Sequence, residues 1–162
     1  MSLGSPSYSL ALDQAAAKAY ENGILLVAAA GNDGTADTTI NNVGYPAKLS
    51  SVIAVAATDI NNNRAYFSST GAEVEVSAPG LNIKSTYLKN GYATMSGTSM
   101  ATPMVAGDLA LLIQVNRGLA IPLTYDGLRN LLHERVIDLG DLDAMGNAIK
   151  DNLYGYGLIQ AQ

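Results

Sequence analysis

Apolar positions along the first sixty residues predict one helix followed by two buried strands. Leucine, alanine and tyrosine recur at helical spacing over residues 10–20, Ser9 or a neighbour can begin the helix, and Asn22–Gly23 is a usual helix end. Residues 24–29 and 52–57 are apolar runs without alternation. Such runs are typical of strands buried on both faces of a parallel sheet.

The rest of the chain predicts an antiparallel extension and two further helices. Short strands with turns, the last at Asn90–Gly91, fill residues 65–94 and favour antiparallel pairing beside the parallel sheet. A buried helix follows Gly97, with Pro103 close to its first turn, where proline is tolerated best. Residues 124–135 form an amphipathic helix and residues 154–159 a closing strand. The pattern therefore predicts one α/β unit.

The loop from Gly31 to Gly44 is the predicted place for a ligand. It follows the first buried strand, and open α/β sheets bind their ligands at the carboxyl ends of the strands.

Composition removes several classes of function. The 162 residues suit one domain, and 48% hydrophobic with 14% charged residues predicts a compact core. A net charge of -5 with scattered Lys and Arg argues against a nucleic-acid-binding surface. Without cysteine there is no disulfide and no cysteine nucleophile, and the redox compartment stays open. The longest apolar run, residues 24–30, is too short for a membrane span, and the N-terminus shows no signal-peptide pattern, which does not exclude secretion.

The residue type that restricts mechanism most is histidine, since the sequence has one. A mechanism that needs an imidazole base must use His133 or receive its histidine from elsewhere.

Ser99 stands where a glycine turn meets the start of a helix, and its position alone allows two interpretations. It can cap the helix, as serines at helix starts commonly do. It can also be a nucleophile, because free N–H groups and the helix dipole at that place stabilise an oxyanion. By position alone Asn32 is a turn residue and Asp33 a solvated loop carboxylate.

Five ordered blocks then favour the second interpretation. They are Met1-Ser2-Leu3-Gly4, Val27-Ala28-Ala29-Ala30-Gly31-Asn32-Asp33-Gly34, Gly44-Tyr45-Pro46-Ala47, Ser77-Ala78-Pro79-Gly80 and Ser96-Gly97-Thr98-Ser99-Met100-Ala101-Thr102-Pro103. Together they resemble the subtilisin-like serine proteases, from residue 1 to about residue 115 and more loosely to Ile159. The resemblance implies a three-layer α/β fold with a mostly parallel sheet between helices, present in residues 1–162 as its C-terminal portion.

The resemblance also implies a role for each block. Ser99 is the nucleophile, which also caps its helix, and Asn32 donates its amide to the oxyanion. Ser2, Leu3 and Gly4 pair with the substrate backbone as an added strand. The specificity pocket is walled by Ala29, Ala30, Gly31 and Gly44, and its small side chains leave room for an aromatic or long aliphatic group. Asp33 near the rim is compatible with a basic one.

Two residues depart from the family pattern. His133 lies downstream of Ser99 and matches no catalytic position, so we expect a surface histidine on the wet face of its helix. Met104 stands where the family usually has histidine, and we expect it to be a packing variation. The family's Asp-Thr-Gly and His-Gly-Thr-His segments do not occur in the sequence.

The expected function is a serine endopeptidase whose general base and orienting aspartate come from a missing N-terminal half of the same domain. This chain alone is then inactive. One alternative is a noncatalytic truncated fragment that binds peptides. The other is an unrelated α/β hydrolase, which Ala101 disfavours because a nucleophile elbow has glycine there.

The remaining expectations concern surroundings. The resemblance implies structural calcium, here at most a weak site of loop carbonyls near Ala47 and Leu49. Expected partners are protein or peptide substrates, with neither nucleic acid nor membrane, and the expected location is extracellular, with a cytoplasmic member as the alternative.

Overall fold

The computed structural model describes residues 1–118, 124–140 and 149–160. In chain order the elements are α1 (Leu10–Glu21), β1 (Leu26–Ala29), β2 (Val52–Thr58), β3 (Val74–Pro79), β4 (Ile83–Tyr87), β5 (Gly91–Met95), α2 (Thr98–Asn116), α3 (Tyr125–Glu134), β6 (Val136–Ile137) and β7 (Leu158–Ile159).

The main sheet has the strand order β1-β2-β3-β7-β6. Its first four strands are parallel, and β6 is antiparallel to β7. Both buried strands expected from the apolar runs are present, as β1 and β2, and α1 is capped by Ser9 as predicted, since the serine side chain accepts from Leu12 N.

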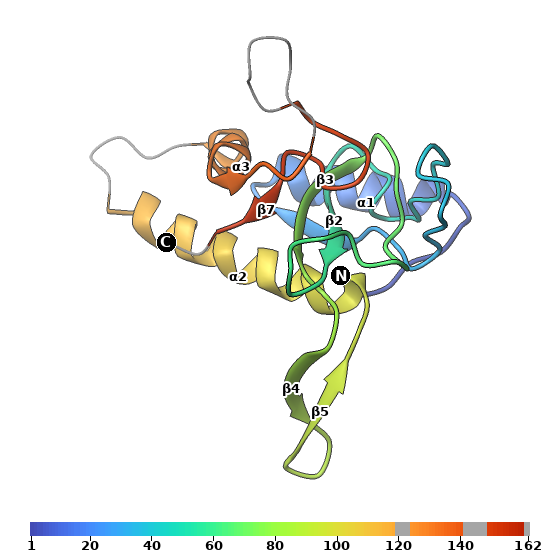
Figure 1. Cartoon of the computed structure of the whole chain (residues 1–162). Helices are drawn as coiled ribbons and strands as arrows, with labels where there is room; N and C mark the ends of the chain where they lie inside the picture. The colour runs from blue at the N-terminus through green and yellow to red at the C-terminus, as the bar shows by residue number, and fades with distance from the viewer. Residues whose placement is uncertain (119–123, 141–148, 161–162) are drawn as a thin grey trace.

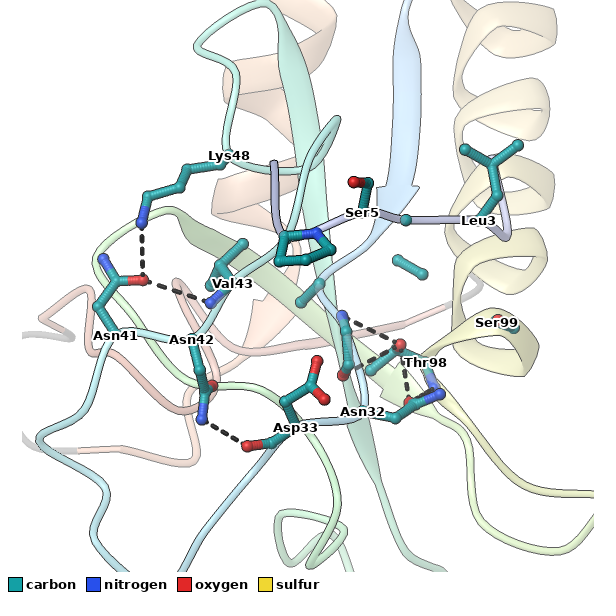
Figure 2. A pocket seen from close by; sticks show the side chains of 16 residues that line it. Leu3, Ser5, Asn32, Asp33, Asn41, Asn42, Val43, Lys48, Thr98 and Ser99 are labelled. Carbon is teal, nitrogen blue, oxygen red and sulfur yellow. Dashed lines mark hydrogen bonds between the residues drawn. The ribbon is translucent and has the colours of Figure 1, made fainter. Parts of the chain in front are cut away.

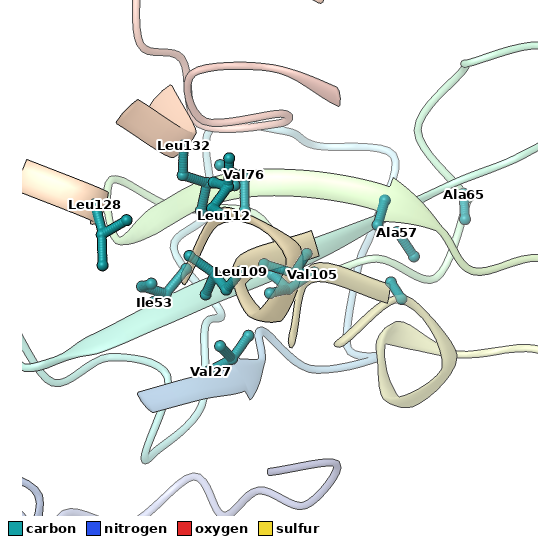
Figure 3. Close-up of a cluster of buried hydrophobic side chains, with 13 residues drawn as sticks. Val27, Ile53, Ala57, Ala65, Val76, Val105, Leu109, Leu112, Leu128 and Leu132 are labelled. Carbon is teal, nitrogen blue, oxygen red and sulfur yellow. The ribbon is translucent and has the colours of Figure 1, made fainter. Parts of the chain in front are cut away.

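The sheet is the middle of three layers, because alternate residues of a strand face opposite sides. Ile53, Val55 and Ala57 of β2 lie in one buried cluster with residues of α2 and α3 (Figure 3). Val52, Ala54 and Ala56 lie in a second cluster, together with Ala16 of α1. The predicted fold class, a mostly parallel sheet between helices, is therefore confirmed.

Helix α2 is the long helix that packs along the sheet. Among the described residues it is the one helix whose length and mean hydropathy, 1.2, would suffice to cross a bilayer, but it contacts β1, β2 and β3 instead. Pro103 lies at the start of the second turn of α2, close to the first turn where it was expected. Met104 is partly buried against the first cluster, which agrees with the packing role expected for it.

For residues 65–94 the predicted antiparallel pairing is confirmed for β4 and β5, but the expectation was wrong for residues 74–79. Strand β3 is a parallel member of the main sheet, not part of an antiparallel extension. The antiparallel hairpin β4–β5 is a separate two-stranded sheet that extends away from the body (Figure 1). Its turn has Lys89 and Asn90 at the centre, both with φ of 57°, so it begins one residue earlier than the Asn90–Gly91 signal indicated.

The closing strand is shorter than residues 154–159. Gly155 and Gly157 have φ of 68° and 139°, so the chain turns there and β7 covers only Leu158–Ile159. Two backbone bonds to β3 precede it, since Tyr156 N donates to Glu75 O and Ser77 N donates to Gly157 O, both at 2.8 Å. A Cβ on Gly155 would lie 2.3 Å from the backbone of Glu75, so the close approach requires glycine.

Candidate active site

A pocket of about 580 Å³ opens at the carboxyl end of β1, as the sheet topology predicts. It is lined by residues 3–6, 29–33, 41–44 and 48 together with Thr98 and Ser99 (Figure 2). Its walls thus come from four places in the sequence: the N-terminal segment, the end of β1, the loop around Gly44 and the start of α2.

The N-terminal segment, residues 1–5, is fixed at both ends. The Met1 ammonium donates to Val27 O, and Ala29 N donates to Met1 O at 3.1 Å, so residue 1 lies along the outer edge of β1. The backbones of Ser5 and Tyr45 are joined by two hydrogen bonds, because each N–H donates to the other residue's carbonyl oxygen at 2.8 Å. The residues between these anchors, 2–4, are exposed beside the pocket, where the resemblance places the substrate-binding strand.

Ser99 is the second residue of α2 and is half-buried at the pocket. The helix cap is Gly97, which makes no side-chain cap bond, so the expectation that Ser99 also caps its helix was wrong. The hydroxyl of Ser99 is therefore not occupied by capping. Its own N–H belongs to the first turn, where an α-helix leaves N–H groups without an acceptor.

The Asn32 side chain is oriented by Thr98. Thr98 donates to Asn32 Oδ1 from its backbone N at 2.9 Å and from its hydroxyl at 3.0 Å. The same hydroxyl accepts from Gly31 N at 3.3 Å. Both bonds engage the oxygen of Asn32, and its Nδ2 has no hydrogen-bond partner among the described residues. A Cβ on Gly97 would lie 3.4 Å from that Nδ2, so the glycine leaves the donor open.

The four small residues expected to wall the pocket do gather in it. Ala29 ends β1, Ala30 follows it, and both are buried. Gly44 N donates to Ala30 O at 2.8 Å. Gly31 has a φ of 125°, and a Cβ there would lie 2.7 Å from Ser69 Oγ. Because no long side chain enters from this side, the pocket remains wide.

Sequence reasoning missed the opposite rim of the pocket. Asn42 donates from Nδ2 to Asp33 O at 2.6 Å and accepts from Thr70 N at 2.8 Å. Lys48 donates to Asn41 Oδ1 at 3.4 Å, so an ammonium stands on the same rim as the exposed Asp33 carboxylate. Two adjacent asparagines ahead of Gly44 were the available signal, but a loop gives no indication of which way its side chains turn.

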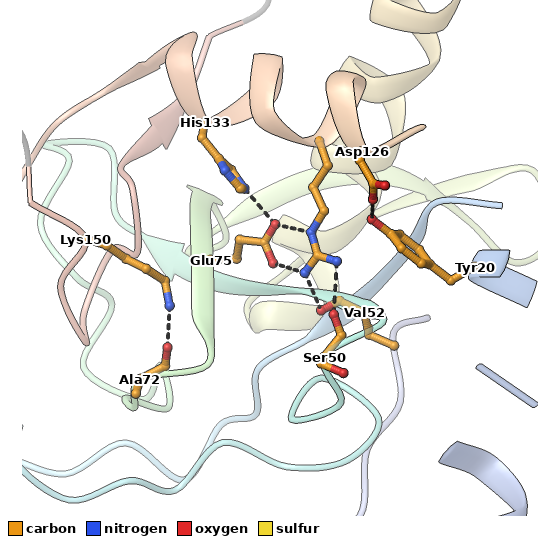
Figure 4. A network of polar contacts seen from close by, with 9 residues as sticks. Tyr20, Ser50, Val52, Ala72, Glu75, Asp126, His133 and Lys150 are labelled. Carbon is orange, nitrogen blue, oxygen red and sulfur yellow. Dashed lines mark hydrogen bonds and ion pairs between the residues drawn. The ribbon is translucent and has the colours of Figure 1, made fainter. Parts of the chain in front are cut away.

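His133 lies in a different pocket from Ser99, in a network with Glu75 and Arg129 (Figure 4). Its side chain is 16% exposed, its Nε2 lies 2.7 Å from Glu75 Oε1, and its ring stacks on Tyr156 with centroids 4.0 Å apart. The expectation of a surface histidine was wrong, because the buried acceptor comes from β3, 58 residues away in the sequence.

Glu75 is the centre of this network, and two opposing effects set its pKa. Burial raises the pKa of Glu75, but hydrogen bonds and charge from Arg129 and His133 outweigh burial and hold the pKa below the ordinary glutamate value. Arg129 Nε donates to Glu75 Oε1 at 2.6 Å. Glu75 in turn holds the pKa of Arg129 above its ordinary value despite the burial of the guanidinium.

The loop around Ala47 and Leu49, where a weak calcium site was expected, lines one pocket together with Arg129. Arg129 donates to Ser50 O at 3.0 Å and to Val52 O at 3.4 Å, so these two carbonyl oxygens are hydrogen-bonded to a guanidinium. The nearby carboxylate of Glu75 is paired with the same arginine. Calcium prefers free carboxylate and carbonyl oxygens. Among the described residues, no group of acidic side chains and histidines suited to a metal is present.

Comparison with known proteins agrees with the sequence motifs. A family model described as the subtilase family matches residues 1–157. The chain is 49% identical over 162 residues to Subtilisin DY of Bacillus licheniformis, covering 100% of the chain and 54% of that protein. It is 51% identical over 160 residues to Minor extracellular protease Epr of Bacillus subtilis (strain 168), covering 99% of the chain and 23% of that protein. It is 44% identical over 162 residues to Subtilisin Savinase of Lederbergia lenta, covering 100% of the chain and 54% of that protein.

The chain thus spans about half the length of the two subtilisins and less of Epr. The match over residues 1–157, together with the predicted motifs, shows that this chain belongs to the subtilase family of serine proteases.

Proposed function

We propose that this chain is the C-terminal portion of a subtilisin-like peptidase domain, and that the domain hydrolyses peptide bonds through an acyl-enzyme on Ser99. The observation that supports this most is the convergence of two groups on one pocket: the Ser99 hydroxyl and the Asn32 amide, whose oxygen is held by Thr98.

In the proposed reaction the substrate backbone pairs with residues 2–4, and the group before the scissile bond enters the pocket. The Ser99 hydroxyl oxygen attacks the carbonyl carbon. The oxyanion accepts hydrogen bonds from Asn32 Nδ2 and from the Ser99 N–H, at the positive end of the α2 dipole. These donors act on charge that develops in the transition state, so they lower the barrier more than they strengthen substrate binding.

We infer that the general base and its orienting carboxylate lie outside this chain. Proton removal from a serine needs an adjacent base. The single histidine, His133, is engaged by Glu75 in another pocket. The chain alone is therefore inactive, and the N-terminal portion of the domain is its first partner.

Two surfaces suit that partner. The outward face of α2 leaves Leu111 and Val115 52% and 60% exposed, which is high for a helix of this hydropathy. The outer edge of β1 pairs only with residue 1 among the described residues, so its sheet edge remains open to a further strand. A covering helix and a neighbouring parallel strand would bury both surfaces.

The proposed substrates are proteins and peptides with an aromatic or long aliphatic group ahead of the scissile bond. The wide pocket with small walls supports this preference, and the exposed Asp33 carboxylate makes a basic group acceptable at the rim. One relative is named an extracellular protease, which supports an extracellular location for this chain too.

The test is reconstitution of the domain. The chain is mixed or co-expressed with a subtilisin N-terminal portion that carries the aspartate and histidine, and hydrolysis of a peptide anilide is followed. We expect activity from the mixture, none from either part, and none when the chain carries Ser99→Ala. Activity that survives Ser99→Ala would contradict the proposal.

A further inference from the structure

Pro103 interrupts the hydrogen bonding of α2, because it removes the helical hydrogen bond to the carbonyl of the proposed nucleophile, Ser99. Proline has no backbone N–H, so the carbonyl four residues earlier loses its helical donor. That carbonyl belongs to Ser99.

The missing donor is replaced from the other end of the chain. Ser2 Oγ donates to Ser99 O at 2.7 Å, across 97 residues of sequence. Ser2 lies between two anchored positions. Residue 1 is hydrogen-bonded to β1, and the backbones of Ser5 and Tyr45 form two hydrogen bonds with each other. The hydroxyl is therefore presented by a fixed segment and not by a mobile loop.

We propose that Ser2 is a positioning residue: its hydroxyl bonds the carbonyl that Pro103 leaves free and thereby fixes the Ser99 peptide relative to the N-terminal segment. This inference rests on the proposed function. It links two parts of the site, because the segment that would bind substrate backbone and the residue that would attack it are joined by one hydrogen bond.

The physical consequence is orientational. The bonded carbonyl lies in the first turn of α2, next to the Cα that carries the attacking hydroxyl, so a displacement of this turn shifts the attacking oxygen and the oxyanion N–H together. The reaction rate depends strongly on such displacements, because a shift of about 1 Å lowers the rate roughly 10²-fold. The bond is exposed, so water can solvate the carbonyl when the hydroxyl is removed, and folding should be little affected.

The test compares Ser2→Ala, Ser2→Thr and Ser7→Ala in the reconstituted domain. We expect Ser2→Ala to lower kcat about tenfold, as a sub-ångström displacement would, with KM little changed and with an unchanged melting temperature. Ser2→Thr restores a hydroxyl and should recover most of the kcat. Ser7 is exposed, lies outside the pocket and makes no side-chain bond among the described residues, so Ser7→Ala should match the parent.

A double-mutant cycle with Pro103→Ala tests the cause. Alanine in place of this proline returns an N–H to the Ser99 carbonyl, so Ser2→Ala should cost clearly less kcat in that background. The inference is overturned if Ser2→Ala leaves kcat unchanged, if Ser2→Thr does not restore it, or if the loss is the same in the Pro103→Ala background.

A readout independent of activity separates this inference from the proposed function. With carbonyl carbon-13 in serine, the Ser99 resonance of the chain should move in Ser2→Ala and stay in Ser7→Ala. An inactive reconstituted domain whose Ser99 resonance responds in this way would reject the peptidase while retaining the bond. An unchanged resonance would reject the bond itself.

Discussion

At the scale of single residues, the site depends on which atom of Asn32 is engaged. Thr98 holds Oδ1 with two hydrogen bonds, so the amide nitrogen is left for the proposed oxyanion. The sequence motif could name Asn32 as a donor by resemblance. It could not show the orientation, because Thr98 lies 66 residues away in the chain.

Substitution of Asn32 by alanine removes that donor. In the reconstituted domain we expect kcat to fall by roughly 10²–10³ with KM nearly constant, which is the magnitude known for loss of the oxyanion asparagine in a subtilisin. Steady-state kinetics on a peptide anilide measures the change. A rise in KM of similar size with kcat unchanged would instead assign Asn32 to ground-state binding of the substrate.

At the scale of elements, the Glu75–Arg129 pair connects β3, α3 and the loop before β2. The carboxylate is 8% and the guanidinium 17% exposed, so neither is free to be solvated if its partner is removed. Arg129→Met should lower the free energy of unfolding by about 3 kcal/mol, because it leaves a buried carboxylate with His133 alone. Urea unfolding measures it, with the exposed Lys84→Met as the control, expected to stay within about 0.5 kcal/mol.

The same pair predicts how stability depends on pH. The folded-state pKa of Glu75 is depressed, so its contribution is present above the ordinary glutamate pKa and is lost as pH falls through the folded value. Stability should therefore decline below about pH 4.3, the ordinary glutamate pKa. In Glu75→Gln this part of the decline should be absent. An equally steep acid profile in Glu75→Gln would refute the assignment.

The elements that the sequence predicted well are those whose signal is local. The apolar runs of β1 and β2 and the cap at Ser9 need no information from elsewhere in the chain. Strand β3 was misassigned because it carries a charged residue at a position buried by a partner 54 residues away. His133 was misplaced for the same reason, since its burial depends on Glu75 and Tyr156.

At the scale of the whole molecule, the outward face of α2 argues for a covering partner. Leu111→Asp should weaken assembly with the N-terminal portion by about tenfold or more, because a charge would be buried in the new contact. Leu88→Asp is the matched control, since Leu88 is 74% exposed and lies in the turn between β4 and β5, the hairpin that extends away from the body (Figure 1). Titration calorimetry compares the two, and equal effects would argue against this docking face.

The central claim is that Ser99 is a nucleophile whose base comes from outside this chain. The most direct measurement is the rate at which an organophosphonate labels Ser99, located by mass spectrometry, with and without the N-terminal portion of the domain. The account predicts slow labelling of the chain alone and rapid, stoichiometric labelling in the reconstituted domain. Rapid stoichiometric labelling of Ser99 in the chain alone would contradict it.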